Sequence, residues 1–234
     1  MIDEDYEAWE QFPHHRWVFN KLEVAMKLKY RCGPACVPVR FNGDYIVRPI
    51  YNLYGMSVGA HYAYLFAKDH KMMENHAFIP PGYFWCEWFD GIHYSIDYKW
   101  ADEGRGGIHS HWAPICTTVG TKDLMQFREW EKTENVYKKL PDWIYDFEDV
   151  GWINIEFIDD KVIEVHLRSG NDIVHEDPNG TKMIPHWKND DIRKIDKLQK
   201  DGWTYYNNYG DDGPYDASGY INNPRMGYLK KWPE

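Results

Sequence analysis

The chain has 234 residues, of which 43% are hydrophobic and 17% aromatic, and this composition supports a folded core rather than a disordered segment. Its net charge of −10 argues against nucleic acid as the main partner, because no basic excess is present to neutralise phosphates, although a local basic pocket for a small phosphate ligand remains compatible with it. No apolar run is long enough to cross a membrane, and the acidic start is not a signal peptide, so we expect a cytoplasmic protein.

The first part of the chain combines a helical pattern with a break. Residues 14–30 carry apolar side chains at helical spacing, which predicts a helix. Glycine and proline then end it in the segment 31–39, RCGPACVPV. The cysteines of the chain have neither zinc nor redox spacing, so we expect reduced packing residues, with a catalytic thiol as the alternative. They are Cys32, Cys36, Cys86 and Cys116.

Strand patterns follow. Residues 43–52 predict a strand, in which Arg48 directly precedes Pro49, and a glycine-bearing loop comes next. The stretch 64–78 is compatible with a helix or with a broken connection. Residues 83–100 predict two strands of a hairpin that turns at Asp-Gly, which is a strong turn signal.

The middle of the chain carries a second helical pattern, and its end carries turn residues. Residues 121–140 predict a helix with Thr121 as N-cap, and residues 141–150 predict a short helix that begins at Pro141. After Gly170, Asn, Asp, Gly and Tyr become frequent, which indicates an irregular C-terminal extension with a last strand over 225–232.

The stretch GWINIEFIDDKVIEVHLRSG predicts a hairpin. Its two apolar faces coincide only if Phe157 lies opposite Ile163, which leaves residues 159–161 as the turn. That register places Glu156 opposite Glu164 on the other face. Facing like charges destabilise a sheet, so we infer a cation between them or an arginine that neutralises them, against the alternative of a solvated polar face. The polar face also carries Asn154, His166 and Arg168.

The order of these elements, from about Asn20 to Arg168, resembles the ATP-grasp fold, in which two α+β subdomains with antiparallel sheets enclose a nucleotide cleft. The resemblance implies an N-terminal subdomain with a glycine loop over residues 1–80 and a C-terminal subdomain with a metal-site hairpin over 81–170. Residues 171–234 would then be an irregular extension packed on the same body.

The resemblance also implies a set of ATP-binding residues. The stretch VRPIYNLYGMSVGA matches the family's basic residue, proline and glycine loop, with Arg in place of the usual Lys. FWCEWFDGIHYSIDY matches the adenine hinge, and one lysine matches the start of the first subdomain. The structural alternatives are a common glycine turn, an ordinary hairpin and a solvated lysine. The implied residues are Lys21, Arg48, Gly55, Ser57, Gly59, Cys86, Glu87, Trp88 and Phe89.

The hairpin carries the implied metal site. The family places an acidic residue on the penultimate strand and Glu-x-Asn, often continued by x-Arg, on the last strand. Glu156 matches the first position, and Glu164, His166 and Arg168 match the others, with His in place of Asn. Mg²⁺ is therefore implied on Glu156, Glu164 and His166, with Mn²⁺ as an alternative because imidazole is a poor Mg²⁺ ligand. His166 serving phosphate or substrate instead is the other possibility.

The function that the resemblance implies is an ATP-dependent ligase. A carboxylate is activated through an acyl phosphate, which an amine or similar nucleophile then attacks, and Arg48, His166 and Arg168 would be the catalytic residues. We expect small-molecule or peptide carboxylates and amines as substrates, and we expect the family's N-terminal substrate domain to be missing. The alternative is a non-catalytic ATP-grasp-like module that binds a nucleotide or has a structural or interaction role. A homo-oligomer or a partner protein is left open.

Overall fold

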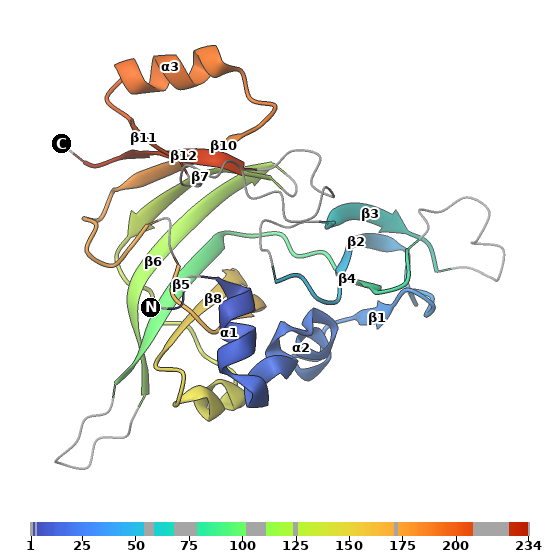
Figure 1. The fold of residues 1–234 in the computed structure, drawn as a ribbon. Helices are drawn as coiled ribbons and strands as arrows, with labels where there is room; N and C mark the ends of the chain where they lie inside the picture. The colour runs from blue at the N-terminus through green and yellow to red at the C-terminus, as the bar shows by residue number, and fades with distance from the viewer. Residues whose placement is uncertain are drawn as a thin grey trace.

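The computed structural model describes residues 2, 4–53, 59–67, 79–101, 111–123, 126–170, 173–207 and 225–233. In these residues the chain forms two antiparallel sheets with short helices packed beside them, so the fold class is α+β, as expected (Figure 1). In sheet order, the first sheet consists of β1 (Cys32–Pro34), β4 (Tyr83–Glu87), β2 (Gly43–Pro49) and β3 (His61–Leu65). The second consists of β11 (Thr204–Asn207), β12 (Arg225–Lys231), β10 (Lys182–Trp187), β7 (Gln126–Thr133), β6 (His111–Asp123), β5 (His93–Ala101), β8 (Trp152–Ile158) and β9 (Lys161–His166).

Three short N-terminal helices pack against one face of the second sheet. They are α1 (Asp5–Gln11), the 3-10 helix η1 (Pro13–Phe19) and α2 (Lys21–Lys27). The single helix predicted over 14–30 is therefore wrong, because the chain breaks at Asn20. Asn20 has an extended backbone, and its side chain accepts a hydrogen bond from the Glu23 N–H at 3.0 Å, so it caps α2.

The main core lies between these helices and strands β5, β8 and β9. The short 3-10 helix η3 (Asp142–Phe147), which Pro141 precedes, confirms the predicted helical turn and closes the same core. Its fully buried side chains are apolar residues from both layers, and their removal from water is the main stabilising term. They include Ala8, Ile96, Ile144, Phe147, Ile153, Ile155, Phe157 and Leu167.

The chain passes from the first sheet to the second at Asp90-Gly91. The hairpin predicted over 83–100 is therefore wrong in its pairing, although both strands exist: β4 pairs with β1 and β2, whereas β5 pairs with β6 and β8. Gly91 has a φ of 145°, and a Cβ there would overlap the Asp159 carboxylate. Asp159 Oδ1 in turn accepts a hydrogen bond from the Ile92 N–H at 2.9 Å, which fixes the start of β5.

The helix predicted over 121–140 is wrong. Residues up to Asp123 continue β6, and β7 begins at Gln126, so the expected N-cap Thr121 lies within a strand opposite Glu129. The helix-forming residues of this stretch yield to strand pairing because Trp130 packs on Gly120 of the neighbouring strand. The stretch 64–78, left open between helix and connection, begins with the end of β3, and its residues 68–78 lie outside the described part of the chain.

The β8–β9 hairpin is confirmed, and Glu156 lies opposite Glu164 as predicted. The predicted pair Phe157–Ile163 is wrong, because a register shift after Glu156 places Val162 opposite Phe157. The turn consequently has two residues, Asp159 and Asp160, instead of three. The bulge keeps the apolar faces together, since Phe157 and Val162 are both buried.

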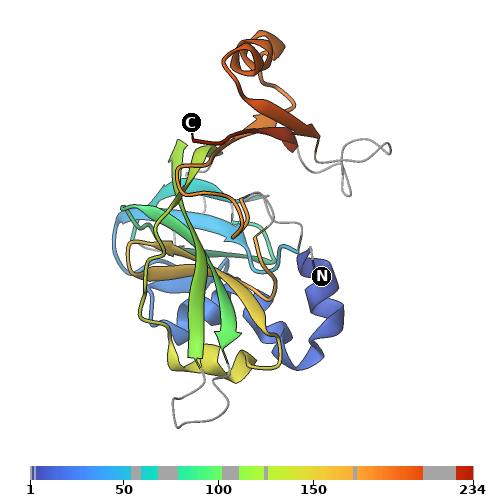
Figure 2. The same cartoon turned by 90° about the vertical axis from the view of Figure 1, so that its left-hand side faces the viewer.

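The C-terminal part extends the second sheet. The described residues after 173 form β10, β11 and β12 together with α3 (Ile192–Lys200), rather than a wholly irregular extension, and the predicted last strand is confirmed as β12. The loop-rich stretch 208–224 lies outside the described residues. Figure 1 and Figure 2 both show β10, β11, β12 and α3 at one end of the molecule. The division of the chain at residues 80 and 170 into subdomains stays a prediction.

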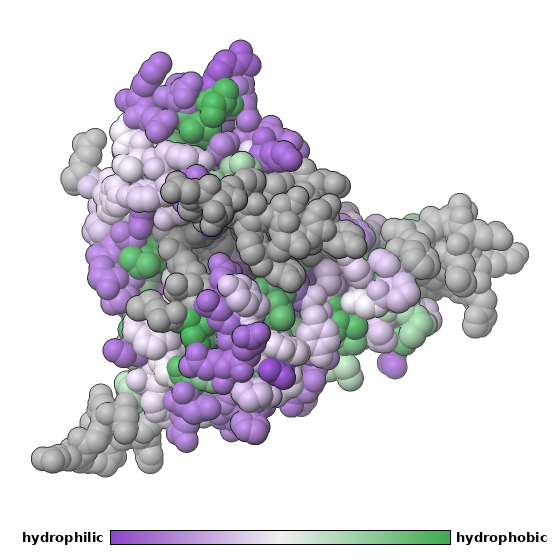
Figure 3. Space-filling model, in the orientation of Figure 1, coloured by the Kyte–Doolittle hydropathy of each residue, from purple (hydrophilic) through white to green (hydrophobic). Residues whose placement is uncertain are grey.

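The surface is mixed in character. On the face drawn in Figure 3, hydrophilic side chains alternate with small hydrophobic patches, and hydrophilic residues dominate around α3. None of the helices in the described ranges is long and apolar enough to span a membrane.

A buried lysine fastens the loop after β9 to the second sheet. Lys132 on β7 has 5% exposure, and its Nζ donates hydrogen bonds to the carbonyls of Val174, His175 and Asp177 at 3.3, 2.6 and 2.5 Å. A buried ammonium requires such partners, and the carbonyls in turn have a charged donor.

We therefore predict that Lys132→Met lowers the free energy of unfolding by about 2–4 kcal/mol, because the three carbonyls lose this donor. The control is Lys182→Met on β10, whose half-exposed ion pairs with Glu129 and Glu131 should contribute less than about 1 kcal/mol. Chemical denaturation of the two variants measures both values, and equal losses would contradict the role given to Lys132.

Candidate functional site

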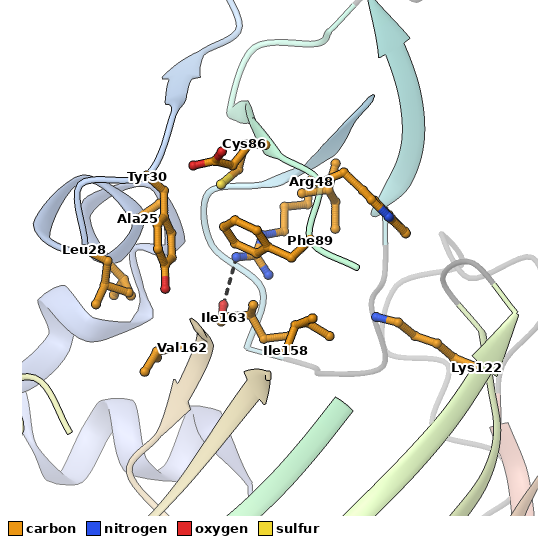
Figure 4. A pocket seen from close by; sticks show the side chains of 14 residues that line it. Ala25, Leu28, Tyr30, Arg48, Cys86, Phe89, Lys122, Ile158, Val162 and Ile163 are labelled. Atoms are coloured by element: carbon orange, nitrogen blue, oxygen red, sulfur yellow. Dashed lines mark hydrogen bonds between the residues drawn. The ribbon is translucent and has the colours of Figure 1, made fainter. Parts of the chain in front are cut away.

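An apolar pocket with a charged end lies between the two sheets. Figure 4 shows Arg48 and Phe89 side by side in its middle, with Tyr30 on one side and Lys122 reaching in from β6 on the other. The pocket draws residues from α2, both sheets and the crossing between them. Its lining consists of Val24, Ala25, Leu28, Tyr30, Ile46, Arg48, Cys86, Glu87, Trp88, Phe89, Lys122, Ile158, Val162 and Ile163.

The structure places the four residues predicted as the adenine hinge together at this pocket. Cys86 and Glu87 end β4, and Trp88 and Phe89 follow where the chain crosses to the second sheet. The backbone N–H groups of Glu87 and Trp88 donate to the carbonyls of Arg31 and Asp44 at 2.8 and 3.0 Å. These two donors therefore stabilise the crossing in this conformation.

Aromatic rings form the other wall. Phe89 and Tyr30 meet edge to face, with ring centroids 4.8 Å apart. The Trp88 ring meets Tyr62 in the same way at 5.3 Å. An apolar pocket with aromatic walls is suited to a flat heterocycle, which gains both burial and ring contacts there.

Arg48 lies at the boundary between the apolar pocket and a charged cluster. Its NH2 group donates to the Ile163 carbonyl at 2.9 Å, its NH1 group lies 3.8 Å from Glu164, and its guanidinium lies 5.4 Å from the Phe84 ring centroid. Its buried Nε has no hydrogen-bond partner in the described residues. Burial lowers the pKa of Arg48, although a guanidinium stays protonated. Arg48 therefore places a cation with one unsatisfied donor beside the pocket.

Lys21 begins α2 and reaches the hairpin from the helical side. Its Nζ makes a direct ion pair with Glu164, and its side chain is 10% exposed. Burial and the nearby Arg48 lower the pKa of Lys21 to about 7, although the carboxylates of Asp5 and Glu156 act in the opposite direction. Lys21 on α2 and Arg48 on β2 thus approach the same carboxylate from different elements.

Glu156 lies beside two histidines. Its carboxylate is 2.9 Å from His93 Nε2 and 3.8 Å from His166 Nε2, which also lies 3.8 Å from Glu164. Burial acts to raise the pKa of Glu156, but the two imidazoles outweigh it and hold this pKa well below its usual range. His166 therefore lies between the two carboxylates that face each other on β8 and β9.

Asp5 is a member of the cluster that sequence reasoning missed. Its carboxylate on α1 is 2% exposed and lies 2.9 Å from both His166 Nδ1 and Arg168 Nε. Burial acts to raise the pKa of Asp5, but the charge of His166 and Arg168 outweighs it and lowers this pKa. Burial likewise opposes protonation of His166, but Asp5 raises its pKa. No sequence pattern marks Asp5, because its partners are more than 160 positions away.

Lys122 was also missed, because its strand was expected to be a helix. Its ammonium lies 5.9 Å from the ring centroids of Trp88 and Phe127, and burial lowers its pKa. Strand alternation would not have placed it either, since the register shifts between Thr121 and Lys122.

The glycine loop is only partly within the described residues. Gly55 and Ser57 lie outside them, whereas Gly59 is described. Gly59 has a φ of 76°, and a Cβ there would press against Tyr83 and Pro49, so this position needs glycine.

The metal predicted on Glu156, Glu164 and His166 requires oxygen ligands that are free to bind it. Among the described residues no group of three His, Cys, Asp or Glu side chains is arranged to hold a metal ion. Glu164 contacts Lys21 and Glu156 contacts His93, so the donors in this arrangement do not fit Mg²⁺, and an ion would first have to displace these partners. The metal assignment stays a prediction.

We predict that Asp5→Asn lowers the free energy of unfolding by about 3 kcal/mol at pH 7, because it leaves buried His166 and Arg168 without their counter-charge. The pKa of Asp5 is lower in the folded chain than its unfolded value of 3.8. The difference from wild type is therefore fully present above that pH and shrinks as the pH falls below it. Denaturation at a series of pH values measures this difference.

Asp149→Asn is the matched control, because the Asp149 side chain is 60% exposed and pairs with His15 at the surface. Its effect should stay below about 1 kcal/mol at every pH. A loss for Asp5→Asn that equals the control, or that grows in acid, would contradict the assignment.

Comparison with known proteins connects this geometry to a fold. No protein-family model matches the sequence, and no curated protein matches it. Among solved structures, carboxyaminoimidazole ribonucleotide synthase from Aspergillus clavatus complexed with ATP matches with a TM-score of 0.57 and 8% identity, over 98% of this chain and 74% of that chain. N5-carboxyaminoimidazole synthetase from Staphylococcus aureus complexed with ADP gives 0.55 and 12%, over 93% and 68%.

An L-amino acid ligase from Bacillus licheniformis matches with a TM-score of 0.50 and 11% identity, over 92% of this chain and 67% of that chain. The three solved structures are ATP-grasp proteins. At these identities the likeness concerns the arrangement of the chain. Two antiparallel sheets and the facing hairpin acids occur as the sequence resemblance implied, and the chain has the ATP-grasp fold.

Proposed function

We propose that the chain binds ATP between the two sheets and uses it as a ligase to activate a carboxylate. The observation that carries this proposal is the convergence of an aromatic pocket and the charged cluster at Arg48, which belongs to both. ATP has a flat base that suits the aromatic pocket and an anionic triphosphate that suits the cations Arg48 and Lys21. The solved structures that contain ATP or ADP have the same fold, which supports the proposal.

The base would lie against the hinge. Phe89 and Tyr30 offer ring faces and edges, and Cys86 with Ile46 closes the apolar wall on the side of the first sheet. Stacking and burial at such a wall do not select how a purine is rotated within the plane of its ring. The orientation must therefore come from polar groups at the pocket edge, of which Glu87 is one.

The triphosphate would lie toward the hairpin. Arg48 and Lys21 come from the first sheet and α2, and Lys122 comes from the second sheet, so phosphates would be bound from both sides. The spare Nε donor of Arg48 and its planar guanidinium suit a phosphate oxygen. Binding of phosphate would compete with Glu164 for Arg48 and Lys21.

The reaction would transfer the γ-phosphoryl group to a substrate carboxylate, and an amine or similar nucleophile would then displace phosphate. Arg168 is the residue that we assign to the charge of the transferred group, because it follows the end of β9 two residues after His166. His166, predicted as catalytic, lies between the carboxylates. We propose small-molecule or peptide carboxylates and amines as substrates, and we assign no step to Mg²⁺.

A second candidate is a non-catalytic module that binds the nucleotide without turnover. The specific observation in its favour is that the three carboxylates of the cluster each have a side-chain partner within the chain. Glu164 has Lys21, Glu156 has His93, and Asp5 has Arg168. Arg168 is thereby engaged by α1, and a substrate carboxylate would have to compete with Asp5.

One experiment separates the two candidates. Thermal unfolding is measured with ATP, with and without Mg²⁺, and ADP release is measured with a panel of free amino acids and short peptides. A ligand at 100 times its Kd stabilises a protein by about 2.7 kcal/mol, so binding gives a clear shift. A shift with substrate-dependent ADP release supports the ligase, a shift with no release across the panel supports the module, and no shift contradicts both.

We predict that Arg48→Met weakens ATP binding by roughly tenfold or more, because one charge-assisted contact to phosphate is lost. The fold should be retained, since methionine fills a similar apolar volume beside Phe84, and circular dichroism checks this. Arg40→Met is the control, because Arg40 is exposed on the same subdomain. Calorimetric titration with ATP compares the three proteins, and equal affinities for wild type and Arg48→Met would reject the phosphate assignment.

A further inference from the structure

Two cysteines face each other across the first sheet beside the candidate nucleotide pocket. In the antiparallel pair of β1 and β4, Cys32 lies directly opposite Cys86. Residues opposite each other on neighbouring strands project to the same face of a sheet. The next strand continues this row, because Ile46 on β2 lies opposite Cys86.

The hydrogen-bond pattern shows which kind of pair this is. The Glu87 N–H donates to the Arg31 carbonyl at 2.8 Å, and the Ala35 N–H donates to the Tyr83 carbonyl at 3.1 Å. Hydrogen-bonded and non-hydrogen-bonded pairs alternate along an antiparallel ladder, so Cys32 and Cys86 form a non-hydrogen-bonded pair. Cα atoms in such pairs are about 4.5 Å apart and their side chains are close. A disulfide requires Cα atoms roughly 4.4–6.8 Å apart, so this pair falls within the range.

The two thiols differ in access. Cys86 is 2% exposed and lines the pocket, whereas Cys32 is partly exposed. Figure 4 shows Cys86 on the wall above Arg48 and Phe89. Burial raises the pKa of Cys32 and raises that of Cys86 to about 12. Both thiols are therefore mostly protonated at neutral pH, and exchange is slow and begins at the more accessible Cys32.

The remaining cysteines have different surroundings. Cys116 is buried in the second sheet, where its thiol donates to the Ile173 carbonyl at 3.7 Å. Cys36 is exposed and lies beyond the end of β1, with no strand residue opposite it in the described pairing. Of the four cysteines, the strand pairing therefore places Cys32 and Cys86 opposite each other.

We propose that Cys32 and Cys86 form a reversible disulfide in the presence of a low-molecular-weight disulfide such as oxidised glutathione. The Cys32 thiolate attacks one glutathione sulfur, the glutathione S–S bond breaks, and one glutathione thiolate leaves. The Cys86 thiolate then attacks the Cys32 sulfur of this mixed disulfide, and the second glutathione thiolate leaves. Two protein thiols are oxidised to one disulfide, and one glutathione disulfide is reduced to two thiols.

This crosslink changes the chain in two ways. It joins β1 to β4 and makes the chain between Cys32 and Cys86 a closed covalent loop. The unfolded state therefore loses conformational freedom, and the folded state is stabilised relative to it. It also turns the Cys86 sulfur from the pocket toward Cys32, which withdraws a contact from the wall for the base. The second effect rests on the proposed ATP site, whereas the first does not.

The test begins with the reduced 234-residue chain and an incubation of several hours with oxidised glutathione. Mass spectrometry is expected to show the loss of two hydrogens, and peptide mapping is expected to join the peptides that contain Cys32 and Cys86. The crosslinked form should melt several degrees higher, and dithiothreitol should restore the reduced mass and melting temperature. Cys36→Ser should behave like wild type, and Cys32→Ser should form no crosslink.

Other results overturn the proposal. A stable glutathione adduct with no crosslink, a link that includes Cys36, or an unchanged mass would each contradict it. ATP titration of the crosslinked form should show affinity several-fold weaker than that of the reduced form, and equal affinities would reject the effect on the pocket. If the reduced chain binds no ATP, the proposed function fails, while the mass and peptide map still decide the disulfide.

Discussion

Two carboxylates lie opposite each other on neighbouring strands, and the rest of the site is arranged around their repulsion. Glu156 and Glu164 share one polar face of the β8–β9 hairpin, while the other face is part of the main core. The core fixes the register, so the chain cannot separate the two charges by a slip of one residue. It must compensate them, and the side chains that do so come from different elements.

This compensation joins the parts of the fold. Lys21 brings α2 to Glu164, His93 brings β5 to Glu156, and Asp5 completes the cluster by bringing α1 to His166. The chain crossing at Asp90-Gly91 then places the aromatic pocket beside the same cluster. The pocket and the charged end are therefore adjacent because one strand, β2, carries Arg48 between them.

The fold and much of the site could be predicted from the sequence wherever local pattern and long-range pairing agree. The opposition of Glu156 and Glu164 followed from alternation, because the core face dictates it. The bulge that pairs Phe157 with Val162 could not be predicted in this way. A two-residue turn with Ile163 as the extra residue buries the same apolar faces as the three-residue turn. The helix predicted over residues 121–140 was wrong for a different reason. Pairing with strands from other parts of the chain outweighed the helix-forming composition of this stretch. Asp5 was invisible for the same reason, as its role depends on residues more than 160 positions away.

We propose that a nucleotide base lies against the hinge between the two sheets. Photolabelling with an azido-adenine analogue of ATP, followed by peptide mapping, tests its location directly. We expect the label to attach to the peptides containing Tyr30 or Cys86–Phe89, which line the pocket, and excess ATP to prevent the labelling. Labelling confined to other peptides, or labelling that ATP does not prevent, would contradict it.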